Sequence, residues 1–459
     1  MTRLQSRLPL PAVALLLFLH GVSPAQDPPA TAPATGDGPP PARRYQGGWT
    51  DWPKMTGDWG GARTDLENRG IRLELDVTQI FQHNAHGGAQ TDNGARYSGS
   101  GDLTLTLDTQ KMGLWPAGTF VINAEPKWGN GLNRKVGALL PVNYDATKPG
   151  DDECMMTLSE WFWIQGIYQG PAGKAAIVLG RVDLARGFDT NAFANDERTA
   201  FMNVGLRNNP QLGAVVGYTP LAAALVYLPT DWLTIWTAVG DSDGQAKRTG
   251  FDTAFHGDAE NIAVAHEWQI EVRPFDLPGT QRLAFGWSPK NLPYVDPRSP
   301  LAELSPLLIR LLGLETVNRL SPYLPYKRAK DNVIVWYSFD QYLYCEPQDP
   351  TQGVGLFGRF GWGREDVNAI EQFYSIGVGG KGILPQRDRD RFGIGYYHMD
   401  LSDRLPPMIH SEHGIECYYS LQVTGWMTVS PDLQIIMNPG GTSGRDVAVV
   451  WGFRVQMNL

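Results

Sequence analysis

Residues 447–459, VAVVWGFRVQMNL, end the chain and alternate between two kinds of side chain. Apolar residues occupy every second position: Val447, Val449, Trp451, Phe453, Val455, Met457 and Leu459. Between them stand Ala448, Val450, Gly452, Arg454, Gln456 and Asn458, which are mostly small or polar. Successive side chains of a strand face opposite sides, so this pattern predicts a strand with one apolar and one polar face. Such a strand suits a wall between lipid and water. An ordinary half-buried strand of a soluble sheet is the alternative that this stretch alone leaves open.

Three other segments repeat the alternation, at residues 71–78, 102–108 and 261–273. In each, apolar residues alternate with charged or polar ones, as in Ile71, Leu73, Leu75 and Val77 against Arg72, Glu74, Asp76 and Thr78. Charges on the inner face of several strands would be costly in a packed core. They are expected in a water-filled barrel.

The spacing of the alternating segments predicts an all-β chain, a transmembrane antiparallel β-barrel of about 16 strands with a short periplasmic N-terminal segment. The predicted strands are 71–83, 98–108, 118–128, 155–168, 174–186, 212–228, 232–240, 260–273, 280–288, 331–345, 353–363, 370–379, 390–400, 412–427, 432–438 and 446–458. Even-numbered strands are followed by short turns, among them Ser430-Pro431, and the long connections follow odd-numbered strands. This asymmetry is typical of outer-membrane barrels, which have short periplasmic turns and long outer loops.

The N-terminus reads as an export signal. Arg3 and Arg7 precede the short apolar stretch 12–19, and Ser23-Pro24-Ala25 resembles a cleavage site. The residues that follow are rich in Pro and Ala and poor in apolar bulk, which predicts a disordered spacer. The predicted organisation is therefore a signal peptide at 1–25, a spacer at 26–48, a periplasmic segment at 49–70 and a barrel at 71–459.

Composition and motifs argue against several functions. The chain has 39 basic and 48 acidic residues, a net charge of -9, so nucleic acid is not an expected partner. Cys154, Cys345 and Cys417 are too widely spaced for a disulfide framework or a metal-ligand motif. No catalytic constellation is visible, so we predict no enzyme activity, no cofactor and no metal site. Residues 300–317 carry leucines at helical spacing and predict a helix inside a long outer loop.

Several motifs occur in order along the chain and carry a family resemblance. They are MTGDWGGARTDL at Met55–Leu66, GRVD at 180–183, NNP at 208–210, WMTVSPDLQ at 426–434 and NPGG at 438–441. From about residue 50 onward the chain resembles the carbohydrate-selective porin family, also called porin B or OprB-type porins. The resemblance implies a sixteen-stranded channel in the outer membrane of a Gram-negative-type envelope, through which sugars diffuse into the periplasm. The terminal Leu459, in place of an aromatic residue, and the Pro/Ala-rich spacer depart from the family pattern.

A barrel of this size needs a constriction in order to select solutes. The loop 187–211 is the predicted constriction because its side chains can hydrogen-bond sugar hydroxyls, although an ordinary exposed outer loop is the alternative. The candidate site residues in this loop are Asp189, Asn191, Arg198, Asn203 and Arg207. Those predicted to point inward from the wall are Glu160, Arg181, Asp183, Glu267, Glu271, Arg359, Glu416 and Arg454.

The leading hypothesis is a passive porin that prefers small sugars, surrounded by outer-membrane lipid and acting as a monomer or a homotrimer. A general or anion-preferring porin is the alternative within the same architecture. A surface-binding barrel without a channel and a soluble periplasmic sugar-binding protein are alternatives of other classes.

Overall fold

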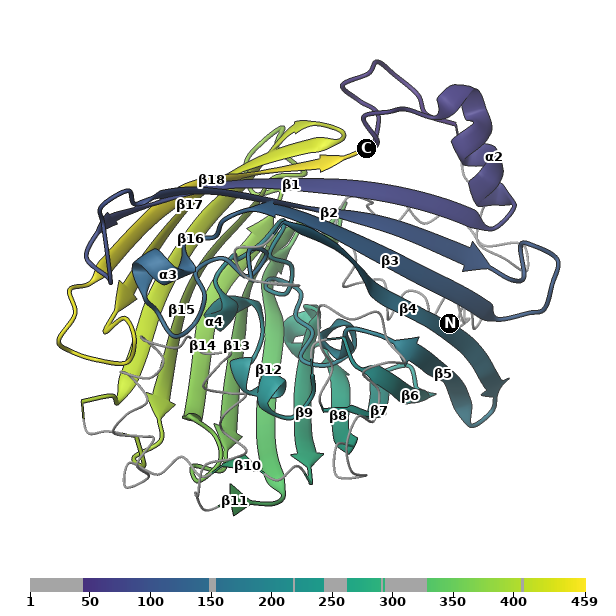
Figure 1. Ribbon diagram of the computed structural model, residues 1–459. Coiled ribbons are helices and arrows are strands. Elements are labelled where there is room, and N and C mark those ends of the chain that lie inside the picture. Colours follow the sequence, from purple (N-terminus) through teal and green to yellow (C-terminus); the bar gives the residue numbers. More distant parts are fainter. Residues whose placement is uncertain are drawn as a thin grey trace.

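The first and last strands of the sheet pair with each other and close it into a barrel. β1 (Ile71–His86) runs antiparallel to β18 (Ala448–Asn458), with Phe81 opposite Phe453. The computed structural model describes residues 44–147, 154–217, 219–242, 262–289, 292–293, 328–405 and 408–459. In this part of the chain sixteen antiparallel strands form one closed barrel, which confirms the predicted fold and strand number (Figure 1). The predicted signal peptide 1–25, nearly all of the spacer 26–48 and the leucine-rich segment 300–317 lie outside the described residues.

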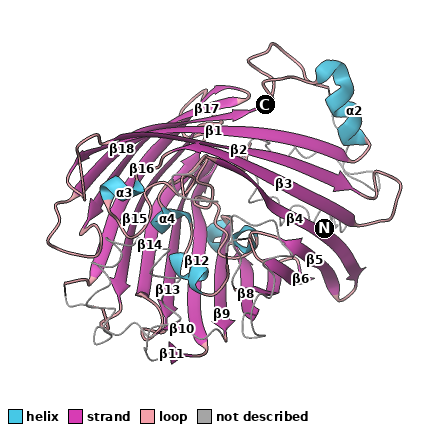
Figure 2. Ribbon diagram, viewed as in Figure 1, coloured by secondary structure: helices cyan, strands magenta, loops and turns pink. Residues whose placement is uncertain are grey.

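The remaining barrel strands follow in chain order around the wall (Figure 2). They are β2 (Ala95–Asp108), β3 (Gly118–Gly129), β4 (Met155–Gly170), β5 (Gly173–Arg181), β6 (Leu221–Thr230), β7 (Leu233–Asp241), β8 (Ile262–Val272), β9 (Gly279–Ser288), β12 (Asn332–Cys345), β13 (Gly353–Gly363), β14 (Ile370–Lys381), β15 (Arg391–Leu401), β16 (Ser411–Thr424) and β17 (Met427–Met437). A separate two-stranded sheet joins β10 (Leu292–Pro293) to β11 (Arg328–Ala329). The helical pieces are short: η1 (Trp59–Gly61), α2 (Ala62–Asn68), α3 (Asn133–Val136), η2 (Leu184–Arg186), α4 (Val204–Arg207), η3 (Pro210–Ala214) and η5 (Pro274–Asp276).

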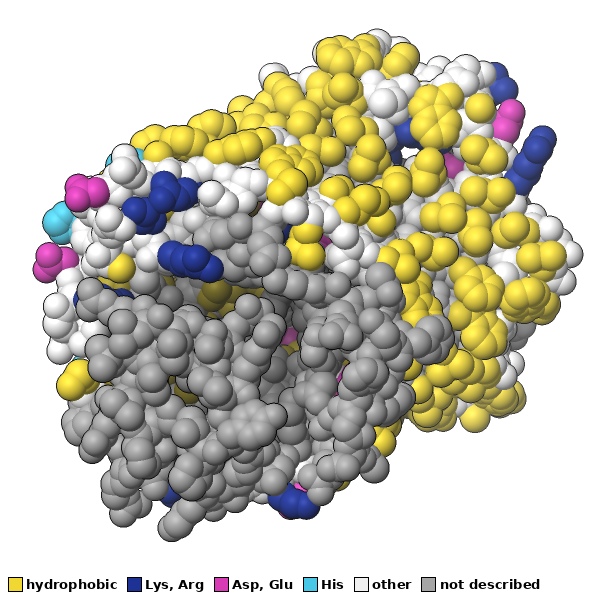
Figure 3. Space-filling model, viewed as in Figure 1, with side chains coloured by type: hydrophobic (Ala, Val, Ile, Leu, Met, Phe, Trp, Pro, Cys, Tyr) yellow, Lys and Arg dark blue, Asp and Glu magenta, His cyan; other side chains and the backbone are white. Residues whose placement is uncertain are grey.

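The last strand faces the two sides as its alternation predicts. Trp451 and Phe453 are 45% and 43% exposed on the outer face, whereas Val450 and Arg454 are buried on the inner face. Figure 3 shows hydrophobic side chains gathered over the outward face of the barrel. An apolar outer face of this kind is suited to contact with lipid. Among the described residues no helix is long and apolar enough to cross a membrane.

The two ends of the barrel differ in the length of their connections. Turns such as 171–172, 231–232 and 425–426 join strands at one end, and connections such as 182–220 join them at the other. The short-turn end is therefore the periplasmic end. The N-terminal segment packs at that end, where the N–H of Met55 donates to the carbonyl of Asn458 (2.8 Å) and the rings of Trp49 and Trp426 lie 4.7 Å apart.

The structure corrects the predicted turn between β16 and β17. The predicted turn Ser430-Pro431 is wrong, because both residues lie inside β17 and the turn is at Gly425-Trp426. Pro431 is opposite Phe453 of β18. On the other side, the pairing with β16 passes from Asp432 directly to Val429, so the missing N–H of Pro431 falls in an interruption of that ladder.

The predicted strands 174–186 and 212–228 are also too long toward the outer end. β5 ends at Arg181 and β6 begins at Leu221. The connection between them is therefore longer than predicted and spans 182–220, a segment that we call the long inner loop.

Candidate functional site in the barrel lumen

The long inner loop folds into the barrel and is held there by a buried ion pair. The Nε of Arg359, on β13, lies 3.0 Å from a carboxylate oxygen of Asp189 in the loop, and neither side chain is exposed. Arg359 also donates to the carbonyls of Leu206 (2.9 Å) and Ala194 (2.6 Å). One wall residue thus holds three points of the loop, and loss of either charge would leave the other buried without its partner.

Wall carboxylates bind the loop backbone on other strands. Glu416 on β16 accepts from the N–H of Met202 (2.6 Å) and of Asn203 (2.9 Å). Glu267 on β8 accepts from the N–H of Asp189 (2.9 Å). These charge-assisted bonds satisfy backbone donors that would otherwise lie unpaired inside the barrel.

Three further predicted residues hold the same loop. Arg454 on β18 donates to the carbonyls of Glu197 (2.6 Å) and Ala200 (2.8 Å). Asn191 donates to the carbonyl of Phe339 on β12 (3.0 Å). Asn203 caps α4 by accepting from the N–H of Gly205 (2.9 Å), and its amide reaches Gln434.

Most of the predicted site residues are therefore directed at the loop rather than at water. Those that are buried while holding it are Asp189, Asn203, Glu267, Arg359, Glu416 and Arg454. The sequence predicts that Asp189 and Asn203 hydrogen-bond sugar hydroxyls and that the four wall residues point inward. In the structure all six hold the loop in position.

An apolar part of the wall completes the attachment, and we call it the apolar seat: the inner faces of β13, β14 and β15 at Gly355, Gly379, Gly393 and Gly395. Phe193, Phe201 and Leu206 of the long inner loop pack against it. A Cβ atom at Gly393 would lie 2.6 Å from the ring of Phe201, and one at Gly379 would lie 2.7 Å from the Cβ of Phe193. Glycine is needed here because the loop approaches the wall more closely than a methyl group permits.

The connection after β3, predicted as a long outer loop, also folds inward, which was not predicted. We call its residues 130–147 the short inner loop. The N–H groups of Leu139 and Leu140 donate to Glu412 on β16 (2.7 and 3.1 Å). The N–H of Tyr144 donates to the carbonyl of Met202, which joins the two inner loops (2.9 Å). The sequence signal for this loop is weak, because its apolar residues resemble those of any packed outer loop.

Three arginines and their carboxylate partners form what we call the charged face of the site, on the side of β2 and β4. Arg198 reaches Asp102 on β2 (2.9 Å), Arg207 pairs with Glu197 (2.5 Å), and the Nε of Arg186 donates to Glu160 on β4 (3.0 Å). The guanidinium of Arg207 also lies 4.1 Å from the ring centre of Tyr144, at cation–π distance.

In each of these pairs the arginine is closer to water than the carboxylate. The exposed side-chain fractions are 20% for Arg198 against 5% for Asp102, and 14% for Arg186 against 2% for Glu160. Arg207 is 12% exposed and Glu197 is 8% exposed. The charged face thus presents three guanidiniums to the lumen with Asp102, Glu160 and Glu197 behind them, whereas Asp183, 3.9 Å from Arg207, is more exposed than that arginine (24% against 12%).

Glu197 and Arg198, neighbours in the long inner loop, are both charged at neutral pH. Burial alone would raise the pKa of Glu197, but Arg207 and Arg198 outweigh it and lower that pKa. Burial would lower the pKa of Arg198, but Asp102 and Glu197 hold it well above its usual value.

Arg181 and Asp183 differ most from their predicted positions. Arg181 is the last residue of β5, opposite Trp161 and Leu221, and its side chain is buried. Its Nε donates to the carbonyl and the hydroxyl of Thr219 in the long inner loop (3.1 Å each), so Arg181 contacts the loop and not an open lumen. Asp183 lies beyond β5, where it caps η2 by accepting from the N–H of Ala185 (3.0 Å). Asp183 differs from its predicted place on a strand because β5 ends at Arg181 and not at residue 186.

Glu271 points inward, as predicted, but at the periplasmic end of β8 and away from the charged face.

The site residues that sequence reasoning missed are Arg186, Asp102 and Tyr144. Arg186 had been assigned to a strand, whereas Asp102 stood in the alternating row of β2 and could have been found there. Within the described residues no group of three or more His, Cys, Asp or Glu is placed to hold a metal ion.

A closed sixteen-stranded barrel with an apolar outer face and a charged loop folded into its lumen defines the class of outer-membrane porins. The family model described as "Carbohydrate-selective porin, OprB family" matches residues 92–459, and the chain belongs to this family. It is therefore a channel of the outer membrane through which sugars diffuse passively.

Similar proteins agree with this assignment. Porin B of Pseudomonas aeruginosa is 23% identical over 431 residues, covering 88% of this chain and 90% of the relative. The putative porin QuiX of Acinetobacter baylyi is 22% identical over 430 residues, covering 88% and 93%. The high-pH structure of Pseudomonas putida OprB has the same fold, with a TM-score of 0.75 at 22% identity over 89% of this chain and 99% of that one.

Proposed function

We propose that small sugars cross the barrel along the charged face, where Arg186, Arg198 and Arg207 select them. The observation that carries this proposal is the order of the charges in three pairs, Arg186–Glu160, Arg198–Asp102 and Arg207–Glu197, in which the guanidinium is more exposed than the carboxylate. A guanidinium offers several N–H donors in a fixed plane, which suits the neighbouring hydroxyls of a sugar. The carboxylates behind the arginines offset their charge, so the face does not act as a strong anion trap.

Selection also requires that these arginines stay in place while solutes pass. The long inner loop carries Arg186, Arg198 and Arg207, and the wall holds that loop through the Asp189–Arg359 pair and through Glu416. A donor set fixed in this way has little conformational freedom to lose when it binds a hydroxyl.

Liposome swelling tests the proposal. We expect glucose to enter faster than amino acids of matched size through the unchanged chain, and this preference to fall severalfold in Arg198→Ala and Arg207→Ala. Arg96→Ala is the matched control, because Arg96 donates to backbone carbonyls at the outer rim, away from the charged face. Equal entry rates for sugars and amino acids below one size limit would overturn the sugar preference.

The exposed guanidiniums also favour a second candidate, a porin that prefers small anions. Reversal potentials in a salt gradient separate the two. A high anion-over-cation permeability together with equal swelling rates for sugars and amino acids would favour the anion porin.

The organisation of the N-terminus belongs to the same proposal. Residues 1–25 direct export, residues 26–48 form a spacer, and residues 49–70 rest on the periplasmic end of the barrel. The contacts of Met55 and Trp49 with the ends of the last strands support the position of the third segment. N-terminal sequencing of the mature protein would test the cleavage after Ala25.

A further inference from the structure

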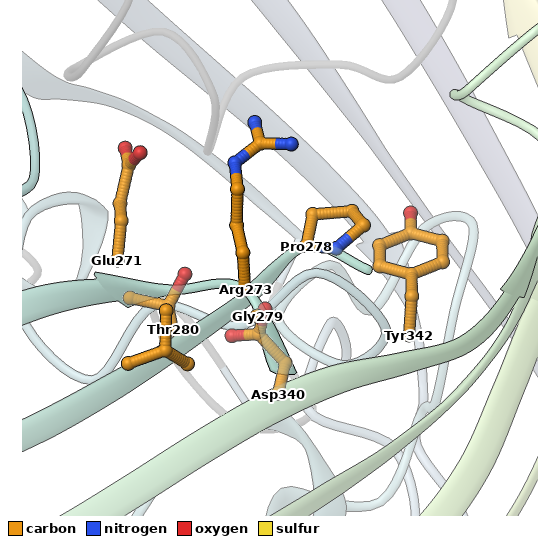
Figure 4. A pocket seen from close by; sticks show the side chains of 8 residues that line it. Glu271, Arg273, Pro278, Gly279, Thr280, Asp340 and Tyr342 are labelled. Atoms are coloured by element: carbon orange, nitrogen blue, oxygen red, sulfur yellow. The ribbon is translucent and has the colours of Figure 1, made fainter. Parts of the chain in front are cut away.

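A separate cavity of about 250 Å³ lies at the periplasmic end of β8, β9 and β12. It is lined by Glu271, Val272, Arg273, Pro278, Gly279, Thr280, Asp340 and Tyr342. Figure 4 shows the side chains of Glu271, Arg273 and Tyr342 rising from the wall into one space, with Asp340 between them. None of the contacts of the charged face involves these residues.

Strand register explains why the polar groups converge. Thr280 of β9 is opposite Glu271 of β8 on one side and opposite Asp340 of β12 on the other, so the three form one inward row across three strands. Neighbouring strands are about 4.8 Å apart, which makes this row about 10 Å long. Pro278 and Tyr342 stand beside the row, joined by the bond from the N–H of Tyr342 to the carbonyl of Pro278 (2.9 Å).

The hydrogen-bonding capacity of this cavity is only partly used. Asp340 is paired with Arg282 (2.5 Å), whose Nε in turn donates to Thr190 of the long inner loop (3.2 Å). By contrast, no described residue forms a hydrogen bond or ion pair with the carboxylate of Glu271 or the guanidinium of Arg273. A carboxylate acceptor and a guanidinium donor thus remain available to a solute.

The charges in and directly behind the cavity balance. Glu271 and Asp340 are negative, while Arg273 and Arg282 are positive, so the four groups sum to no net charge. A cavity with several donors and acceptors and no net charge suits a neutral polar solute better than an ion.

An aromatic side chain gives the cavity an apolar surface and links it to the loop. Tyr342 lines the cavity, and its ring lies 4.9 Å from the ring of Phe193 in the long inner loop. The cavity therefore lies directly next to the loop, on its periplasmic side, where a solute that has passed the loop arrives.

We propose that this cavity is a second sugar-binding site of the channel, which receives one sugar ring at the periplasmic mouth. Glu271, Thr280 and Arg273 hydrogen-bond its hydroxyls, and Tyr342 and Pro278 contact its apolar face. The inference rests on the proposed passage of sugars and adds a site distinct from the charged face. A sugar then passes two sites in turn, first the charged face and then this cavity. Because the cavity lies at the periplasmic mouth, sugar bound there exchanges with the periplasm more readily than with the outside.

Planar bilayers containing the purified full chain test the site. Glucose is added to one side at a time, and the reversible reduction of ion current gives a half-blocking concentration for each side. We expect block at lower glucose concentration from the periplasmic side. In Glu271→Gln and Arg273→Gln this concentration should rise about fivefold to tenfold from the periplasmic side, with a smaller rise from the outer side, since each lost hydrogen bond to a charged group weakens binding by that order.

Glu346→Gln is the matched control, because Glu346 lies in the periplasmic turn after β12 but does not line the cavity. Periplasmic half-blocking concentrations that are the same in Glu271→Gln, Arg273→Gln and the unchanged chain would overturn the site, as would absence of any glucose block in an open channel. Liposome swelling with the unchanged chain tests the sugar preference independently of the current-block experiment. Sugar-selective swelling without periplasmic block would therefore overturn this second site and leave the proposed function standing.

Discussion

Among the regions of the inner wall that contact the long inner loop, two do so with opposite chemistry. Toward β13, β14 and β15, the apolar seat receives Phe193, Phe201 and Leu206 at glycine positions. Toward β2 and β4, the charged face joins Arg198 and Arg186 of the loop to Asp102 and Glu160 of the wall. One side of the loop is packed as in a protein core, and the other remains beside water.

The difference shows how a charged constriction can be held in a wide barrel. Close apolar packing and buried ionic anchors fix the position of the loop on one side. The arginines of the charged face are then held in place by the loop without being fully buried themselves. Their donors therefore stay available to solutes. The comparison predicts that changes on the packed side release the loop, whereas changes on the charged face alter selectivity and leave the loop in place.

The largest effect is expected from Asp189→Asn. The change leaves the guanidinium of Arg359 buried without its counter-ion, which costs about 3–5 kcal/mol. We expect the loop to leave its position, the single-channel conductance to rise, and the sugar preference to disappear. Asp366→Asn is the control, because Asp366 pairs with Arg364 at a similar distance (2.6 Å) in a partly exposed outer connection, where such pairs contribute little. Unchanged conductance in Asp189→Asn would show that the pair does not hold the loop.

A smaller release is expected from Gly393→Ala. The new methyl group would lie 2.5 Å from the ring of Tyr418 and 2.6 Å from that of Phe201, and overpacking of this kind costs about 1–3 kcal/mol. We expect a lower free energy of unfolding and noisier open-channel current. Gly213→Ala, in the long inner loop, provides the comparison, since its added Cβ meets no neighbouring atom within 4 Å. If both variants behave like the unchanged chain, the apolar seat does not fix the loop.

The sequence predicts the charged face much better than the apolar seat. Period-two alternation identifies a strand and its two faces, so the barrel, the inward rows and the presence of a constriction loop could all be predicted. Alternation also predicts a polar inner face throughout, and this is wrong at the apolar seat and at Val450, because side chains there meet the inner loops rather than water.

The roles of individual site residues depend on contacts that are distant in the sequence. Glu416 and Arg359 were chosen because they point inward, and they do. Whether an inward side chain meets water or the loop depends on the path of residues 182–220, for which no periodicity gives a signal. The short inner loop was missed for the same reason.

Asp102→Asn is expected to act on the charged face alone. It removes the carboxylate nearest to Arg198 and leaves the loop anchors intact, so the lumen becomes more positive at that point. We expect the anion-over-cation permeability ratio, from reversal potentials, to rise about twofold to fivefold, equivalent to at most about 1 kcal/mol. The rise should shrink at high salt, which screens the charge. The control is Asp92→Asn, at an exposed position of an outer loop, which should leave the permeability ratio unchanged. If Asp102→Asn increased the conductance as much as Asp189→Asn does, the separation of the two regions would be contradicted.

The smallest effect concerns pH and the short inner loop beside the charged face. Burial raises the pKa of Asp145 to about 6, although Ser100 opposes the shift by donating to its carboxylate (2.7 Å). Because this pKa lies above the ordinary value of 3.8, the folded chain takes up the proton at a higher pH than the unfolded chain does. Its contribution to the free energy of unfolding therefore increases as pH falls from about 6 toward 4, and this gain is lost as pH rises through 6.

Protonation of Asp145 also removes one negative charge near Arg198, so the reversal potential of the unchanged chain should shift toward anions between pH 7 and pH 5. In Asp145→Asn that shift should be smaller, since the charge is already absent at pH 7. Any shift that remains is due to other carboxyls; one with a raised pKa is Asp183, where burial outweighs the opposing effect of Arg207. A shift in Asp145→Asn equal to that of the unchanged chain would mean that this carboxyl does not titrate between pH 7 and pH 5.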